Sequence, residues 1–435
     1  CLVPRSPHPV SEVRFQAARY RRSTKFARWS LLANPARPAK SAWYRPVPAL
    51  SKRYILGNRK ITDFFAIFGH HPVPLMNDQM TTDDTTDRAF SIYPEIRKMF
   101  DEFTRFHPEI LPSRYWEELN RKNLQQLADT KYENFKRTVA RNYFTWIVNP
   151  LNKQIRFLAK EAGFRMSLKI FVRALFTPPH QHLKKRHTIC YNILTNLLWD
   201  YVKKGDVDSL LDKLIEPSEG NPPEVLRKGR LISQDLANSV LEYKAMLHPD
   251  VNRQAVRTIL ELGPGYGRTA YVFLALQPDC KYILVDIPPA LYVAQRYLTS
   301  VFPNRRSFQF RPIDDFEDIR EEFEDASIIF LTPNQLKLLP EHSIDLFINI
   351  SSLHEMRMDQ IQFYFTEIER LTGRYFYFKQ WQKTTVPFEN ETIRESDYPV
   401  RDNWRLINRQ QCEVQHEFFE ALYELPGNDD APSKP

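Results

Sequence analysis

The sequence has few cysteines, few glycines and no long uncharged apolar run. The four cysteines, Cys1, Cys190, Cys280 and Cys412, are too few and too scattered for a disulfide framework or a zinc cluster, which favours a reducing compartment. No apolar segment approaches the roughly 18 residues that a membrane helix needs, so we expect no membrane span. Glycine occurs 11 times in 435 residues, yet three glycines fall within five positions, which marks that segment for attention.

Positive charge is concentrated near the N-terminus. Residues 1–60 hold 14 Lys and Arg against the single acid Glu12, whereas the whole chain carries a net charge of only +8. Frequent prolines and weak apolar periodicity predict a disordered basic arm over residues 1–88, and residues 426–435 are expected to form a disordered tail. The alternative for the arm is a targeting or nucleic-acid-binding segment.

Apolar residues recur at three- and four-residue spacings between residues 89 and 250, which predicts a helical cap domain. Aromatic side chains on this pattern, among them Trp116 and Tyr143, are interpreted as core. Ser233 is a predicted N-cap. The expected helices cover residues 112–127, 134–146, 187–203 and 230–247.

Residues 251–425 alternate between short apolar runs and amphipathic stretches. Near-continuous apolar strands that alternate with helices indicate a parallel sheet covered on both faces, and right-handed crossovers then give a doubly wound, Rossmann-like α/β sheet. The expected strands cover residues 258–262, 282–286, 327–331, 344–350 and 375–378, and the expected helices cover residues 269–276, 290–301, 315–323 and 358–371.

A glycine-rich turn, Glu261-Leu-Gly263-Pro-Gly265-Tyr-Gly267, ends the first of these strands. Glycine permits a positive φ and a close approach of the backbone to a ligand, and the amides of the next helix point at the turn. Asp286, 19 residues beyond Gly267, ends the second strand, where a carboxylate can accept hydrogen bonds from ribose hydroxyls. We therefore expect a nucleoside-containing cofactor, bound by Glu261, Gly263, Gly265, Gly267, Asp286 and Ile287.

The glycine spacing distinguishes between cofactors. The turn reads Gly-x-Gly-x-Gly, and Arg268 stands where the third glycine of the nicotinamide pattern would lie. Together with Glu261, two positions before the first glycine, the turn looks like motif I of class I S-adenosylmethionine (SAM) methyltransferases. We predict SAM as the cofactor, with Asn334 after the third strand and Asn349 on the fourth as further contacts.

The segment that follows the fourth strand, Ser351-Ser-Leu-His354-Glu355, is the predicted site of chemistry, because ligands sit beyond the carboxyl ends of strands in open α/β sheets. Methyl transfer to a hydroxyl requires alignment and removal of the hydroxyl proton. His354, whose ordinary pKa lies near neutrality, is the predicted base, and Glu355 either orients it or replaces it. The alternative is a helix start at which Glu355 is a solvated first-turn acid.

Lys379 and Trp381 follow the fifth strand and are predicted to line a carbohydrate pocket. The alternative is that Trp381 is core and Lys379 is a surface residue. We find no acidic cluster that demands a metal ion, so no metal site is predicted.

Several segments together resemble the bacterial sugar O-methyltransferase family, and the resemblance covers roughly residues 90–425. It implies a class I methyltransferase fold and transfer of a methyl group from SAM to a sugar hydroxyl of a glycan or a nucleotide-linked sugar. It also implies a cytoplasmic location. It also directs attention to Gln234, Asp235 and Asn238 as roof residues near the cofactor and substrate, although they could equally be the polar face of a helix. The matching segments are 112–120, 134–137, 232–238, 261–267, 351–356, 376–381, 397–399 and 415–423.

Three alternatives stay open. The first is an O-methyltransferase of another small molecule, and the second is a nicotinamide-dependent oxidoreductase. The third is a non-catalytic Rossmann-type protein that binds nucleotides, or RNA through the basic arm, although we do not expect a nucleic-acid partner. The acceptor sugar and the oligomeric state are not predictable from the fold.

Overall fold

The computed structural model describes residues 82–104, 110–143, 153–386 and 388–426, and these residues alone are discussed below. Almost all of the predicted basic arm and of the predicted C-terminal tail lies outside this part of the chain. None of the helices in the described part is long and apolar enough to cross a lipid bilayer.

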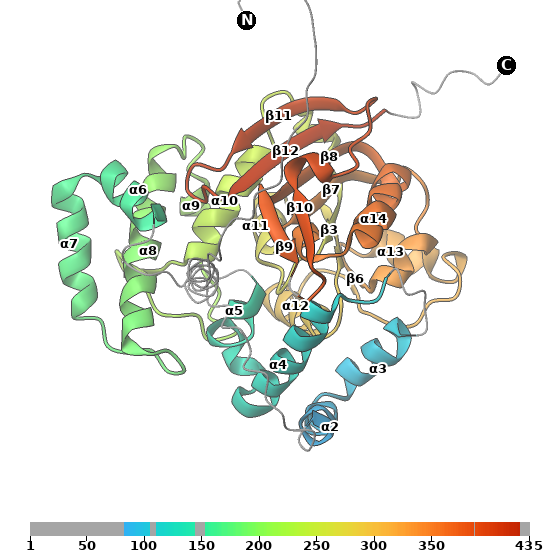
Figure 1. Ribbon diagram of the computed structural model, residues 1–435, viewed down its shortest axis with the longest axis horizontal. Helices are drawn as coiled ribbons and strands as arrows, with labels where there is room; N and C mark the ends of the chain where they lie inside the picture. Colours follow the sequence, from blue (N-terminus) through green and yellow to red (C-terminus); the bar gives the residue numbers. More distant parts are fainter. Residues whose placement is uncertain (1–81, 105–109, 144–152, 387, 427–435) are drawn as a thin grey trace, which may run out of the picture. The chain divides into compact units, whose positions relative to one another are not determined.

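The centre of the molecule is an eight-stranded sheet with the strand order β11-β12-β8-β7-β3-β4-β6-β5 (Figure 1). Every neighbouring pair from β5 to β8 is parallel, and β12 runs antiparallel between β8 and β11. The Rossmann-like α/β class predicted from the sequence is therefore confirmed. The strands are β3 Thr258–Leu262, β4 Lys281–Val285, β5 Ser307–Phe308, β6 Ile328–Leu331, β7 Ile344–Ile350, β8 Thr372–Trp381, β11 Arg405–Gln411 and β12 Phe418–Glu424.

Helices cover both faces of this sheet, because successive side chains of a strand point to opposite sides. Ile259 and Ile348 belong to one apolar cluster with α8 Lys185–Lys204, α10 Gln234–Met246, α11 Arg268–Leu276 and α12 Ala290–Val301. Leu260 and Phe347 belong to a second cluster with α13 Arg320–Asp325 and α14 Met358–Leu371. Figure 1 shows α11 and α14 on opposite sides of β3 and β7.

The N-terminal helices share the first of these clusters. Leu124, Phe135 and Leu197 are buried in the same continuous core as one face of the sheet. The boundary at residue 250 between a cap and a cofactor domain stays a prediction. The helices are α2 Thr82–Ile92, α3 Pro94–Phe103, α4 Arg114–Thr130, α5 Ala140–Tyr143, α6 Lys153–Ala162, α7 Phe164–Leu175 and α9 Leu210–Lys213.

Short elements connect these parts. Two hairpins lie outside the main sheet: β1 Leu226–Arg227 with β2 Arg230–Leu231, and β9 Lys383–Val386 with β10 Glu391–Arg394. The 3-10 turns are η1 Tyr132–Arg137, η2 Arg253–Ala255, η3 Glu317–Ile319, η4 Pro333–Leu338, η5 Leu353–Glu355 and η6 Glu395–Asp397.

Local side-chain chemistry explains where the helices match the prediction and where they do not. The Ser233 hydroxyl accepts a hydrogen bond from the Leu236 amide at 3.0 Å, so the predicted N-cap of α10 is confirmed. The helix predicted over residues 315–323 is present but shifted: a 3-10 turn covers Glu317–Ile319 and α13 covers Arg320–Asp325. The Asp315 carboxylate accepts the Glu317 amide at 3.0 Å and favours a turn at the start. The helix predicted over residues 134–146 is broken at Thr138, and residues 144–146 lie outside the described part.

Candidate functional site

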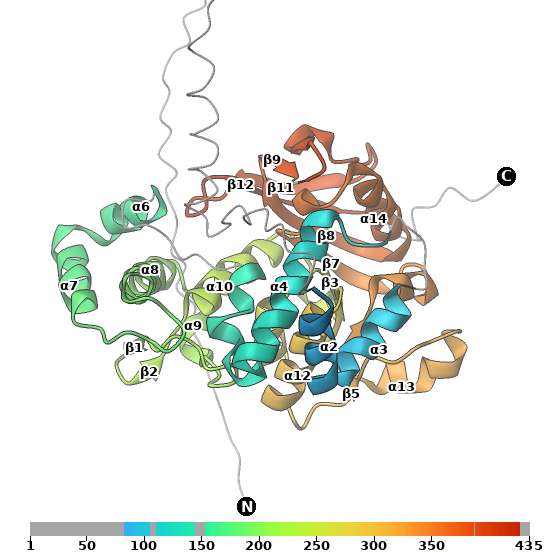
Figure 2. The ribbon, with the colours of Figure 1, turned by 60° about the horizontal axis from the view of Figure 1, so that its bottom comes forward.

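A cleft opens at the carboxyl ends of β3, β4 and β7. It holds about 810 Å³ of empty space, counted out to open solvent. The N-terminal end of α4 contributes Ser113 and Trp116 to its wall, so the helical half of the chain contacts the sheet where the strands end (Figure 2).

The glycine turn forms one wall of this cleft. Gly263 and Gly265 have φ angles of +74° and +60°, which residues with a Cβ rarely adopt. A Cβ on Gly263 would lie 2.6 Å from the Ser352 hydroxyl, and one on Gly265 would lie 3.3 Å from Tyr143. Only glycine at these positions keeps the backbone exposed to the cleft.

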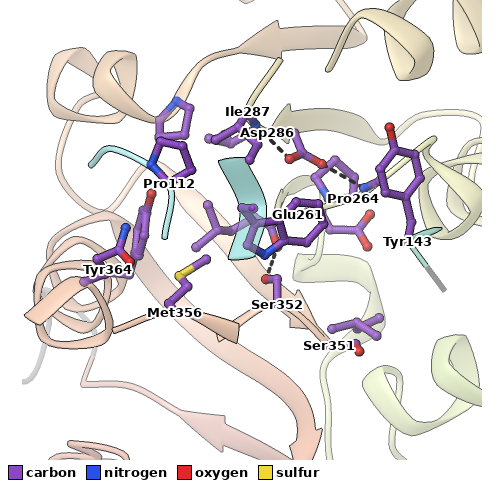
Figure 3. A pocket seen from close by; sticks show the side chains of 18 of the residues that line it. Pro112, Tyr143, Glu261, Pro264, Asp286, Ile287, Ser351, Ser352, Met356 and Tyr364 are labelled. Carbon is purple, nitrogen blue, oxygen red and sulfur yellow. Dashed lines mark hydrogen bonds between the residues drawn. The ribbon is translucent and has the colours of Figure 1, made fainter. Parts of the chain in front are cut away.

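Asp286 lies against the turn and lines the same cleft. Its Oδ2 accepts a hydrogen bond from the Gly265 amide at 2.9 Å, and its Oδ1 accepts one from the Ile287 amide at 2.7 Å. Burial raises the pKa of Asp286 to about 7, although the two amides lower it. Figure 3 shows the carboxylate between Ile287 and the turn at Pro264, with Tyr143 beside the turn. The structure therefore brings together the turn and the acid that the sequence singled out.

Glu261 places a second buried carboxyl in the same wall. The Tyr282 hydroxyl donates a hydrogen bond to Glu261 Oε2 at 2.7 Å. Burial raises the pKa of Glu261 to about 7, although this hydrogen bond lowers it. The cleft thus carries two acids that change charge near neutral pH.

Asn349 fixes the geometry between β7 and the turn. Its Nδ2 donates to the Leu262 carbonyl at 2.9 Å and to the Ser352 hydroxyl at 2.6 Å, while its Oδ1 accepts from Gln380 Nε2 at 2.5 Å. The side chain is fully buried and is not among the residues that line the cleft. Its contacts are those of a positioning residue.

His354 is buried in the segment that follows β7, and neither it nor Glu355 is among the residues that line the cleft. Gln380 Oε1 lies 2.9 Å from His354 Nδ1 and also accepts the His354 amide at 3.2 Å. The Gln380 amide nitrogen donates to Asn349, so its oxygen must face the histidine, and Nδ1 carries the proton. His354 Nε2 lies 3.9 Å from Glu355 Oε1, which is too long for a hydrogen bond.

Glu355 is enclosed by the start of α4. Burial raises its pKa to about 8, although a hydrogen bond from the Trp116 side chain lowers it. The Ser113 hydroxyl donates to the Glu355 carbonyl at 3.1 Å. With 17% of its side chain exposed, Glu355 is not the solvated first-turn acid of the alternative interpretation.

Asn334 follows β6, next to Pro333, which lines the cleft. Its Oδ1 is buried and has no hydrogen-bond partner among the described residues. A buried amide oxygen without a partner destabilises a protein, so this atom is suited to a donor on a ligand.

Gln234 and Asp235 lie away from the main cleft and line a second, smaller cavity with Lys136 and Glu216. Both polar atoms of the Gln234 side chain are buried and lack hydrogen-bond partners in the described part of the chain. Asp235 Oδ2 accepts a hydrogen bond from the Tyr266 hydroxyl at 2.5 Å, which connects this cavity to the back of the glycine turn.

Lys379 and Trp381 also lie outside the residues that line the main cleft. Lys379 is not the surface residue of the alternative interpretation, because it is buried and its ammonium donates to Glu242 Oε1 at 2.9 Å. The Trp381 ring packs against His354 with the ring centroids 5.9 Å apart. The structure therefore gives both side chains partners within the protein.

Two residues of the cleft were missed. The interpretation of Trp116 and Tyr143 as core was wrong, because both are partly exposed and line the cleft. Their rings stack with centroids 6.5 Å apart and an angle of 23° between the planes. Helical spacing alone does not separate an aromatic that faces a cleft from one that faces the core.

Among the described residues, no group of three or more His, Cys, Asp or Glu side chains could hold a metal ion.

No known family model and no curated protein matches the sequence. Solved structures match part of the chain. The PH0226 protein from Pyrococcus horikoshii OT3 is 15% identical and covers 45% of this chain and 92% of its own, with a TM-score of 0.31. A SAM-dependent methyltransferase from Aquifex aeolicus is 14% identical, with coverages of 52% and 98% and a TM-score of 0.25.

Magnesium protoporphyrin IX methyltransferase from Synechocystis PCC 6803, solved with bound SAH, is 12% identical, with coverages of 53% and 99% and a TM-score of 0.32. These TM-scores are low, and the class of the protein follows from its own sheet. Seven strands share one direction, and the glycine turn after β3 faces the acid after β4. These features define a Rossmann-like α/β protein with a cleft at the strand ends. The sugar O-methyltransferase resemblance stays a sequence prediction.

Proposed function

We propose that this protein binds SAM in the main cleft and transfers its methyl group to a hydroxyl of a sugar. One observation carries the proposal: Asp286 and the glycine turn lie side by side in the cleft wall, with 2.9 Å between Asp286 Oδ2 and the Gly265 amide. The hydroxyls of a ribose need a hydrogen-bond acceptor such as Asp286. A ligand that lies close to the backbone needs a turn without side chains. The sugar as acceptor rests on the sequence resemblance.

The residues of the cleft fit such a cofactor. Gly263 and Gly265 leave the backbone free of side chains, Asp286 accepts from ribose, and the unpartnered Asn334 Oδ1 accepts from the adenine amine. SAM supplies an electrophilic methyl carbon on a positively charged sulfur. Glu261 and Asp286 add negative charge at the same wall, which favours a cationic ligand.

The same features disfavour a nicotinamide cofactor. A pyrophosphate at the turn would meet the buried acid Glu261, whereas Asp286 suits the ribose of either cofactor. Arg268, at the position of the third glycine, does not compensate, because its guanidinium is buried and donates to Glu242 at 2.5 Å.

Glu355 and His354 are the proposed bases for the acceptor hydroxyl. A pKa of about 8 gives Glu355 substantial fractions of both protonation states near neutral pH, which suits proton transfer. Gln380 holds the proton of His354 on Nδ1, so Nε2 is the nitrogen on the side of Glu355. The hydroxyl proton then passes to the Glu355 carboxylate or to His354 Nε2.

Aromatic rings give the cleft a surface for the acceptor. Trp116 and Tyr143 stack on each other, and Tyr364 contributes a third ring. Figure 3 shows Tyr143 and Tyr364 on opposite sides of the cleft. The C–H face of a sugar ring packs well on such surfaces, while its hydroxyls reach polar groups. This arrangement supports a sugar acceptor without excluding other small hydroxylated molecules.

Calorimetry with SAM, SAH and NADH tests the cofactor. We expect SAM and SAH to bind to the full chain and the Asp286→Asn variant to bind both at least tenfold more weakly. Asp318→Asn, which changes an exposed acid outside the cleft, is the control and should bind like the wild type. Binding of NADH without binding of SAM would overturn the proposal.

The acceptor needs a separate experiment. Nucleotide sugars and small hydroxylated compounds are incubated with the protein and SAM that carries a labelled methyl group. Label in a sugar supports the full proposal. If only another compound becomes labelled, the protein is a methyltransferase but a sugar is not its acceptor. If no compound of either class becomes labelled, methyl transfer to a hydroxyl is rejected.

A further inference from the structure

Helix α7 presents an apolar stripe to solvent. Phe164, Leu168, Val172 and Leu175 have exposed fractions of 81%, 52%, 46% and 59%, and Phe176, just after the helix, has 82%. Spacings of four, four and three residues place the helical members on one face. The opposite face of α7, with Ile170 and Ala174, is buried.

The stripe is concentrated in one place. Half of the large apolar side chains that are exposed in the described part of the chain fall within residues 164–176. Scattered exposed apolar residues are normal, but a continuous patch marks a surface that binds something.

Basic residues run beside the stripe. Arg165, Lys169 and Arg173 follow its first three members by one position each, and all three are exposed. Residues 153–187 contain nine Lys and Arg and a single acid, Glu161. An amphipathic helix of this kind, with aromatic and aliphatic residues on one side and cations beside them, is typical of helices that lie at a membrane surface.

The position of α7 agrees with such a role. Figures 1 and 2 both show α7 on the outer side of α6 and α8, with α8 between α7 and α10. None of the α7 residues lines the main cleft. A ligand on this face would therefore leave the cleft open.

We propose that α7 and its basic flanks bind a lipid surface that carries anionic headgroups. The apolar stripe enters the boundary between headgroups and acyl chains, and the Lys and Arg side chains pair with the headgroups. The inference does not depend on methyl transfer.

Charge disfavours two other occupants of this face. A second copy of the chain that used the same face would bring two strongly basic segments together. The N-terminal segment 1–60, with 14 Lys and Arg against one acid, has the same sign of charge and would be repelled as well.

Cosedimentation of the full chain with vesicles tests the proposal, using phosphatidylcholine alone and phosphatidylcholine mixed with phosphatidylglycerol. The stripe variant carries Phe164→Ser, Leu168→Ser and Phe176→Ser, and the charge variant carries Arg165→Gln, Lys169→Gln and Arg173→Gln. The matched control carries Val207→Ser, Ile215→Ser and Phe388→Ser, which also removes three exposed apolar side chains. All substituted residues are exposed, so the variants should fold, which their thermal unfolding checks.

We expect the wild type to bind the anionic vesicles at least tenfold more tightly than the neutral ones. The stripe and charge variants should each bind the anionic vesicles at least tenfold more weakly than the wild type, while the control binds them like the wild type. Absence of wild-type binding, or equal binding to both vesicle types, would overturn the proposal. So would a stripe variant that binds like the wild type, because the basic N-terminal segment would then explain the binding. A stripe variant that changes only from dimer to monomer would assign the face to a second copy instead.

Discussion

At the scale of single residues, the Asp286 carboxyl should make cofactor binding depend on pH. Burial raises its pKa to about 7, and only the ionised form accepts hydrogen bonds from both ribose hydroxyls. The ionised fraction rises about tenfold between pH 6 and pH 8, so affinity for SAH should rise by a similar factor. Calorimetry at pH 6, 7 and 8 measures this change in the affinity for SAH.

The Asp286→Asn variant should bind SAH weakly and with little dependence on pH. Glu261 also has a pKa of about 7, so Glu261→Gln is measured in parallel. A pH dependence that survives in Asp286→Asn but disappears in Glu261→Gln would transfer the role to Glu261.

The Glu355 carboxyl gives a second prediction at this scale. Glu355→Gln preserves the shape of the side chain and an oxygen for the Trp116 hydrogen bond, but it cannot accept the acceptor's proton. If Glu355 is the base, kcat should fall about 10²- to 10⁴-fold, while the Kd for SAH changes less than twofold. The wild-type rate should rise with pH up to about pH 8, where Glu355 becomes ionised.

His354→Ala distinguishes the two proposed bases. A large loss of kcat in this variant, with normal turnover in Glu355→Gln, would make His354 the base. Glu321→Gln, on an exposed part of α13, controls for the change of charge. Wild-type rates in both site variants would reject the base assignment altogether.

The sequence predicted some of these residues for a physical reason. Glycines in a positive-φ turn and an acid at the end of a strand are local patterns, so Gly263, Gly265 and Asp286 could be found without the fold. Trp116 and Tyr143 could not, because their place in the cleft depends on how α4 and α5 pack against β3 and β7. The enclosure of Glu355 by Trp116 depends on the same packing.

At the scale of elements, the turn after β3 should not tolerate a side chain at Gly263. In Gly263→Ala, the new Cβ would lie 2.6 Å from the Ser352 hydroxyl at a φ of +74°. We expect SAH binding to weaken at least tenfold and the protein to lose about 1–3 kcal/mol of stability. Calorimetry and urea unfolding measure the two effects.

Gly229→Ala is the matched control, because Gly229 has a φ of +79° and a Cβ added there would have no atom within 4 Å. Gly229→Ala therefore has the same backbone strain as Gly263→Ala but no collision of the new Cβ with another side chain. Equal effects of the two variants would mean that the collision with Ser352 is unimportant. Normal SAH binding by Gly263→Ala would contradict the role of the turn in the cofactor site.

Elements with strong periodicity were predicted well. The bounds of β3, β7, α12 and α14 agree with the sequence prediction at both ends, because buried strands and amphipathic helices carry their pattern locally. β5 was missed because it has only two residues. β11 was missed because it is an edge strand, Arg405–Gln411, that is rich in Arg and Gln and largely exposed.

At the scale of the whole molecule, a buried ion cluster connects the helical half to the sheet. Glu242 on α10 accepts hydrogen bonds from Arg268 on α11 and from Lys379 on β8, at 2.5 and 2.9 Å. All three side chains are buried. No sequence pattern predicts this cluster, because its members are far apart in the chain and meet only through the fold.

Glu242→Gln should therefore destabilise the whole molecule. The substitution leaves Arg268 and Lys379 buried without their anion, and removal of one partner from a buried pair costs about 3–5 kcal/mol. Urea unfolding, followed by circular dichroism, measures the loss. Glu322→Gln is the control, because its pair with Arg311 is about half exposed and should contribute little.

The pH dependence of this effect has a definite sign. Burial raises the pKa of Glu242, but the charges of Arg268 and Lys379 outweigh it and hold the pKa at about 2, below the ordinary value of 4.5. The unfolded chain therefore binds this proton more readily than the folded protein. The contribution of Glu242 to stability is complete above about pH 4.5 and is lost as the pH falls toward 2, so the difference between wild type and Glu242→Gln should shrink over that range. A difference that stays constant from about pH 6 to about pH 3 would show that the carboxylate charge is not what holds the two halves together.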